Sequence, residues 1–134
     1  MTPVEEATVQ SVVTSVSTRM ADPSFGQIAI GSFAQHHPDA GRFITAQHEQ
    51  LGGSDGVVHA VFHAQVLNEC FERHLGRALR PVTFRDLDAA SGPAVVQRFD
   101  EAQPSLSSYV VSNVDDGKMR EVLALVGLAM TAAG

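Results

Sequence analysis

The sequence has 134 residues, the usual size of one domain and enough to bury a core without disulfides or bound metals. Hydrophobic residues make up 44% of it and charged residues 18%, so we expect an ordered globular domain rather than a disordered chain. The formal net charge of -6 disfavours binding to nucleic acids and to anionic lipid surfaces.

Cellular location is predicted from three features of the chain. The only cysteine, Cys70, cannot form an internal disulfide, and residues 1–6 lack the basic start and apolar stretch of a signal peptide. The longest apolar run, near residues 122–130, is shorter than the roughly 18 to 20 residues of a membrane span. The sequence therefore predicts a cytoplasmic protein with no membrane segment.

Two helices are predicted in the first 36 residues. Thr2-Pro3 is typical of a helix start, because threonine caps the helix and proline occupies its first position. Asp22-Pro23 repeats this signal and predicts a second helix that ends near His36, with residues 27–33 open to an alternative interpretation as a short strand. The residues predicted to face the core recur at helical spacing: Val9, Val12, Val13, Val16 and Met20 in the first helix, and Phe25, Ile28, Ala29 and Phe33 in the second.

The middle of the chain predicts two more helices. Pro38 opens a segment in which Phe43, Ile44 and Leu51 recur at helical spacing before Gly52-Gly53 ends it. Ser54-Asp55 can cap the longest helix, which we expect to span residues 56–79 because Pro81 then forces a break.

Three or four short helices complete the chain. Thr83 to Asp86 predicts a capped helix that ends near residue 90, and Ser91-Gly92-Pro93 starts the next. Pro104 either kinks that helix or begins a new one, and Asp115-Asp116-Gly117 precedes a strongly apolar last helix. The whole chain is predicted to be all-α, a single domain of seven to eight helices over residues 1–134.

The long helix gathers the side chains that can carry chemistry. At about 100° per residue, His59, His63, Cys70 and His74 lie within about 60° of arc on one face. Imidazole and thiolate are preferred ligands of zinc, and His59 with His63 and Cys70 with His74 are each spaced to hold one ion. Because these pairs lie about 16 Å apart along the helix, each needs outside ligands. Such ligands can come from the same helix of a second subunit or from other histidines of the chain: His36, His37 and His48.

A simpler interpretation needs no metal. His59 and His63 are then hydrogen-bonded residues that line a core or groove, and Cys70 is a small buried hydrophobe. Cys70 lies within a helix rather than at an exposed helix start, and the sequence has no zincin motif, nucleophile elbow or phosphate loop. The sequence therefore predicts no catalytic residue.

The order of elements resembles that of a globin. A second helix that ends at Pro38, then Phe43, then a long helix with His63 is similar to the part of a globin that leads to its distal histidine. This resemblance implies a haem site formed by His63, Phe43 and His59. No histidine follows His74, however, and residues 84–90 offer no iron ligand where the proximal one is expected. Globin-like domains without haem, which act as sensory or interaction modules, are easier to reconcile with this departure.

Three functions follow as expectations. The first is a non-enzymatic cytoplasmic domain that binds a small apolar ligand or a partner protein and forms a homo-oligomer through an apolar helix face. The second is a globin-like protein that binds haem. The third is a helical homodimer supported by a metal at His59, His63, Cys70 and His74.

Overall fold

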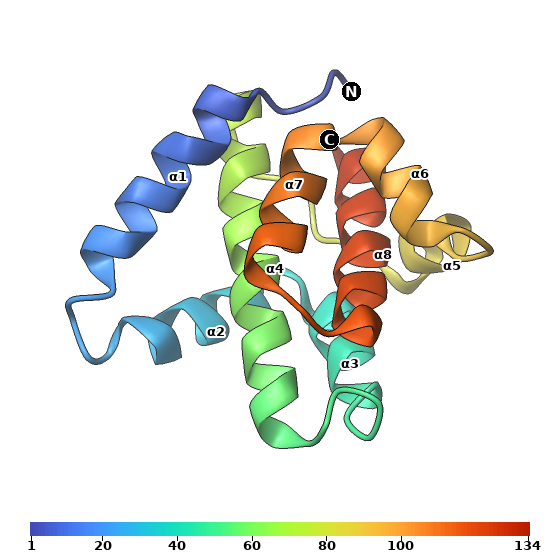
Figure 1. Ribbon diagram of the computed structural model, residues 1–134, viewed down its shortest axis with the longest axis horizontal. Coiled ribbons are helices and arrows are strands. Elements are labelled where there is room, and N and C mark those ends of the chain that lie inside the picture. Colours follow the sequence, from blue (N-terminus) through green and yellow to red (C-terminus); the bar gives the residue numbers. More distant parts are fainter.

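In the computed structural model, which describes residues 1–134, the chain folds into eight α-helices and no strand (Figure 1). This confirms the predicted all-α class and replaces the strand alternative for residues 27–33 with a helix. None of the helices combines the length and apolar content that a membrane span requires. The helices are α1 (Glu6–Arg19), α2 (Phe25–His36), α3 (Pro38–Ala46), α4 (Ser54–Leu75), α5 (Phe84–Ala90), α6 (Val95–Ala102), α7 (Pro104–Asn113) and α8 (Gly117–Ala133).

The core forms around α4 and α8, which run side by side through the middle of the molecule (Figure 1). α8 is apolar on nearly all sides and packs against α4, α5, α6 and α7, as its sequence predicts. The ring of Phe99 on α6 lies so close to Gly127 that a side chain there would overlap it. Thirty buried residues drawn from the whole chain form one cluster, so the protein is a single compact domain.

Local signals placed four of the eight helix starts correctly, those of α3, α5, α7 and α8. α2 and α6 each begin two residues after the proline that was expected to open them, and neither has a side-chain cap. Thr83 and Asp86 form the expected capping box of α5, and the Asp116 carboxylate accepts hydrogen bonds from two backbone N–H groups of α8. Pro38 and Pro104 each occupy the first turn of a new helix. These signals act within a few residues, so the rest of the fold does not override them.

The predicted start of the first helix was wrong. α1 begins at Glu6, and the residues before it form an arm that runs across one end of the domain, from α1 toward the C-terminus (Figure 1). Val4 is buried, and its N–H donates to Oε1 of Gln103 at 2.8 Å. Thr2 pairs its hydroxyl with Nε2 of His74 at 3.0 Å instead of capping a helix. Burial of Val4 therefore outweighs the local capping signal.

Both predicted ends of the long helix were also wrong. α4 begins at Ser54 rather than residue 56, so Ser54 and Asp55 lie inside the helix, and its N-cap, Gly53, has no side chain to form a cap. α4 ends at Leu75 because Gly76 adopts a left-handed conformation with a φ of 70°, which closes the helix one turn before the expected boundary. Residues 76–83 then form a linker that crosses to α5, with Leu79 and Val82 buried.

Helix α2 differs from its prediction in orientation. Ala29 and Phe33 face the core, but Ile28 is 59% exposed instead of buried. α2 packs on α3 and α4 and diverges from α1, so one of its sides has no helix against it (Figure 1).

Candidate docking groove

An apolar groove of about 640 Å³ lies between α2, α3 and α4. It is open to the surface along its length, and most of its lining residues are themselves exposed or half-buried. Its only charged side chain is that of Arg42, so the groove offers an apolar surface and no nucleophile or general base. The lining residues are Ile30, Ala34, Pro38, Gly41, Arg42, Thr45, Ala46, Val57, Val58 and Val61.

The groove results from small and β-branched residues at the contacts of three helices. α2 ends at His36 and Pro38 begins α3, so the chain turns sharply within two residues. Gly41 on α3 faces Ala34 on α2, and a Cβ placed at Gly41 would lie 3.8 Å from the Ala34 Cα. The small residues at the α2–α3 contact therefore leave space between the helices. Three valines of α4 also line this space: Val57, Val58 and Val61.

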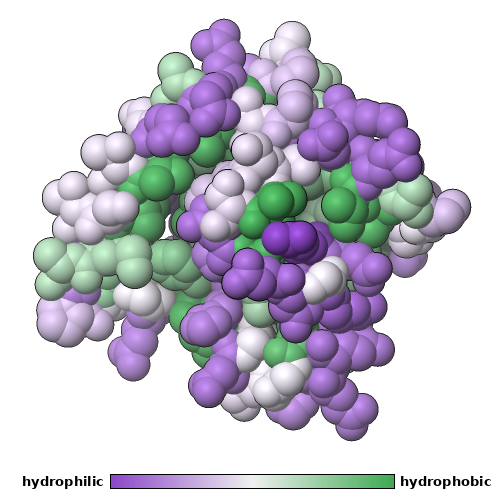
Figure 2. All heavy atoms as spheres, viewed as in Figure 1, coloured by the Kyte–Doolittle hydropathy of each residue, from purple (hydrophilic) through white to green (hydrophobic).

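Charge is scarce around the groove. Helix α2 contains no Asp, Glu, Lys or Arg, although the chain as a whole has a net charge of -6. At the edge of the groove the Arg42 guanidinium lies 3.3 Å from the Asp39 carboxylate, which offsets its charge. Figure 2 shows further hydrophobic atoms at the surface on the left of the view, where α1 leads into α2. Val58 projects at the groove with 44% exposure, whereas Ile28, with 59% exposure, lies about 160° around α2 from the groove-lining Ile30.

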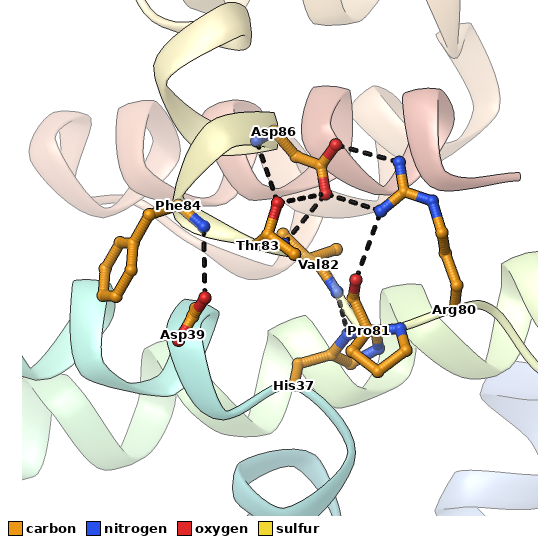
Figure 3. A network of polar contacts seen from close by, with 8 residues as sticks. All are labelled: His37, Asp39, Arg80, Pro81, Val82, Thr83, Phe84 and Asp86. Carbon is orange, nitrogen blue, oxygen red and sulfur yellow. Dashed lines mark hydrogen bonds and ion pairs between the residues drawn. The ribbon is translucent and has the colours of Figure 1, made fainter.

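His37 fastens the α2–α3 corner to the rest of the domain. The residue is fully buried, and its Nδ1 accepts a hydrogen bond from the backbone N–H of Val82 at 3.0 Å (Figure 3). Nε2 must then carry the ring proton, which it donates to Oδ1 of Asn68 on α4 at 2.8 Å. Burial, aided by the nearby His36, holds the pKa of His37 below its usual value, which keeps the ring neutral as this arrangement requires.

His36 and Glu72 hold the same linker from the other side. Nε2 of His36 donates to the carbonyl of Leu79 at 2.8 Å, and the Glu72 carboxylate accepts from the N–H of Leu79 at 3.3 Å. The sequence predicted His36 and His37 only as additional metal ligands. Their position at a turn that precedes a proline could have indicated this structural role, because buried backbone groups at such a turn need hydrogen-bond partners.

A second set of contacts secures the far end of the linker (Figure 3). Arg80 forms a bidentate ion pair with Asp86, at 2.7 and 2.9 Å, and this guanidinium holds the pKa of the Asp86 carboxyl well below its usual range. The backbone N–H of Phe84 donates to Asp39 at 3.3 Å. These contacts connect the linker to α5 and to α3, which forms part of the groove.

The structure separates the four predicted metal ligands. His59 is exposed, while Nδ1 of half-buried His63 is hydrogen-bonded to the Tyr109 hydroxyl of α7 at 2.9 Å. Burial lowers the pKa of His63 and raises that of Tyr109. Cys70 is completely buried, which raises the pKa of its thiol to about 12 and confirms the interpretation of this residue as a core hydrophobe. No three groups from His, Cys, Asp and Glu lie together in a way that can hold a metal ion.

The residues implied by the globin resemblance also lie apart. Phe43 lines a hollow between α3, α6 and α8 together with Val95 and Leu125. His63 instead packs against Phe62 and Tyr109 between α4 and α7, and His59 is on the surface. These side chains do not enclose a common pocket of the kind that haem requires.

Comparison of the chain with protein-family models, curated proteins and solved structures finds no match. The function of the protein must therefore be inferred from the groove and from the chemistry of the residues around it.

Proposed function

We propose that this protein is a non-enzymatic helical domain that docks an apolar helix face in the α2–α3–α4 groove, and that the partner is a second copy of the chain. The observation that carries the proposal is an open apolar groove whose only charged lining side chain is Arg42, next to a helix, α2, that has no Asp, Glu, Lys or Arg and exposes Ile28 on its outer face. A two-fold symmetric dimer needs such a self-complementary surface, because each copy presents the same patch to the other.

The arrangement of α2 supports this mode of packing. At about 100° per residue, Gly31 lies between Ile30, on the groove side, and Ile28, which projects. A Cβ built at Gly31 meets nothing within 4 Å, so the backbone of α2 is accessible at that point. A second α2 can therefore approach closely at Gly31, with the side chain of Ile28 directed toward the groove of the opposite copy.

Electrostatics favours this surface over others for self-association. Two copies with a net charge of -6 each repel one another, and burial of unpaired charges adds a further cost. An interface centred on α2 buries no formal charge from that helix. The nearest charges, Arg42 and Asp39, already pair within one copy.

The groove alone is too small to form a stable dimer interface. A stable interface uses about 20 to 30 residues on each side, whereas ten residues line this groove. The proposed contact must therefore extend over the outer face of α2, which is exposed and uncharged: Gln27, Ile28 and Gly31.

The proposal predicts the mass of the protein in solution. Sedimentation should give twice the chain mass of 14.2 kDa, and Val58→Glu should raise the dimer dissociation constant by about tenfold or more, since it places a charge in the apolar contact. Val111→Glu is the matched control, because Val111 on α7 is as exposed as Val58, at 47% and 44%, but lies away from the groove. A wild-type monomer at every concentration, or equal effects of the two substitutions, would contradict the proposal.

Two finer features belong to the same proposal. The eight helices support a globin-like module that acts without haem, since the globin fold also packs eight helices. The free, buried Cys70 supports a place in the reducing cytoplasm.

A further inference from the structure

The side of α2 opposite the groove borders a second hollow with a different character. It measures about 390 Å³, lies between α2 and α4, and has no hydrophobic residue in its lining. Apolar packing normally fills the space between two helices that pack together, so a wholly polar hollow there calls for an explanation. The lining residues are Ser32, Gln35, His36, Gln65, Asn68 and Glu72.

The side-chain amide of Asn68 has a fixed orientation in this hollow. The backbone N–H of Val82 assigns the ring proton of His37 to Nε2, and this proton requires an acceptor, which is Oδ1 of Asn68. The Nδ2 amide of Asn68 therefore points away from His37. Asn68 is only 3% exposed and lines the hollow, yet its Nδ2 group makes no hydrogen bond within the protein.

The acceptors of the hollow are also unused. Oε1 of Gln65 is buried without a hydrogen-bond partner, whereas Ser32 and Gln35 are exposed at the mouth of the hollow. Glu72 engages one carboxylate oxygen with the linker and has the other free. Buried polar groups nearly always find partners, so the buried Gln65 oxygen and the Asn68 amide, together with the free Glu72 oxygen, indicate a site that binds a polar molecule.

The composition of the walls selects the class of ligand. Glu72 contributes a carboxylate, Asn68 contributes a rigid donor, and no hydrophobic side chain is present to cover a hydrocarbon. The only ring, that of His36, is held by the Leu79 carbonyl and packs edge-to-face on His37. The volume lies within the range of small-molecule sites. We infer that the hollow binds a small, non-aromatic primary amine that carries a carbonyl or hydroxyl oxygen: the ammonium pairs with Glu72 and the oxygen accepts from Asn68.

The wall of the site is held in place before any ligand arrives. His37 fixes Asn68, while Leu79 donates to Glu72 and accepts from His36. Pre-organised polar groups lose little freedom on binding, so each contact contributes more to affinity.

Glycinamide is a suitable probe, because it has both the ammonium and the carbonyl oxygen. Titration followed by NMR should shift the side-chain amide signals of Asn68 and Gln65. Acetamide has no charge and so loses the ion pair with Glu72, and ethylamine has no oxygen and so loses the hydrogen bond from Asn68. Each should therefore bind about tenfold more weakly than glycinamide.

Glu72→Gln should weaken glycinamide binding by about tenfold and remove the preference over acetamide, while its amide oxygen can still accept from Leu79. Glu101→Gln on the exposed side of α6 removes the same charge from a distant place and should leave binding unchanged. Amide signals that do not move with glycinamide, or equal losses in the two variants, would overturn the inference. This test does not depend on dimer formation, and unchanged backbone spectra of both variants would show that the fold is intact.

Discussion

The two sides of α2 differ in what they leave unsatisfied. Toward the groove, Ile30 and Ala34 present apolar surface that is still accessible. Toward the polar hollow, Ser32 and Gln35 present exposed hydrogen-bonding groups. A helix turns by about 100° per residue, so a twelve-residue helix can serve both surfaces with its core face between them. Although α2 has no Asp, Glu, Lys or Arg, its apolar side and its polar side are therefore suited to different partners.

Both surfaces depend on His37, so its removal should have the largest effect. His37→Ala leaves the buried N–H of Val82 and Oδ1 of Asn68 without partners and creates a cavity. We expect a loss of about 3 kcal/mol or more in the free energy of unfolding, measured by urea denaturation. His48→Ala, at an exposed position without a side-chain hydrogen bond, should change it by less than about 0.5 kcal/mol. Similar stabilities of the two variants would show that the groove and the hollow do not share this anchor.

Acid should weaken the same anchor more gently. The pKa values of His37 and His63 lie below the ordinary 6.5, mainly because both rings are buried. Below pH 6.5 the two histidines therefore bind protons more readily in the unfolded chain than in the folded protein. The free energy of unfolding decreases as the pH falls from 6.5 toward the pKa values of the folded protein.

The measurement is the free energy of unfolding between neutral pH and about pH 5, above the range in which most carboxylates titrate. In His37→Gln the slope should be smaller, because one of the two titrating rings is gone. A wild-type slope of zero, or a variant slope equal to that of the wild type, would contradict this assignment.

The smallest expected change distinguishes binding from stability within the hollow. Gln65→Leu removes a buried oxygen that has no partner, so the free energy of unfolding should rise by about 1 kcal/mol while glycinamide binding weakens. Gln97→Leu, on the exposed side of α6, should change neither quantity. A destabilised Gln65→Leu protein would mean that the amide supports the fold rather than a ligand.

Prediction from the sequence succeeded where the signal was local. The cap formed by Thr83 and Asp86, the cap at Asp116 and the proline-led starts of α3 and α7 depend on contacts within one helical turn. Prediction failed where a distant partner decided the outcome. Val4 and Gln103 are 99 residues apart, and their hydrogen bond holds residues 1–5 out of the first helix.

The candidate sites show the same limit. Helical periodicity put His59, His63, Cys70 and His74 on one face of α4, but their surroundings could not be read from that periodicity. The packed domain exposes His59, pairs His63 with Tyr109, and buries Cys70. The groove was anticipated only as an apolar helix face, without its residues.

The class of fold, the globular composition and half of the helix starts were already present in residue patterns, because these depend on short-range hydrogen bonding and on total apolar content. The corner at His37, the apolar groove and the polar hollow arose only when α2, α3, α4 and the linker came together. Each is formed by residues far apart in the chain, and their contacts depend on helix packing, which no local pattern specifies.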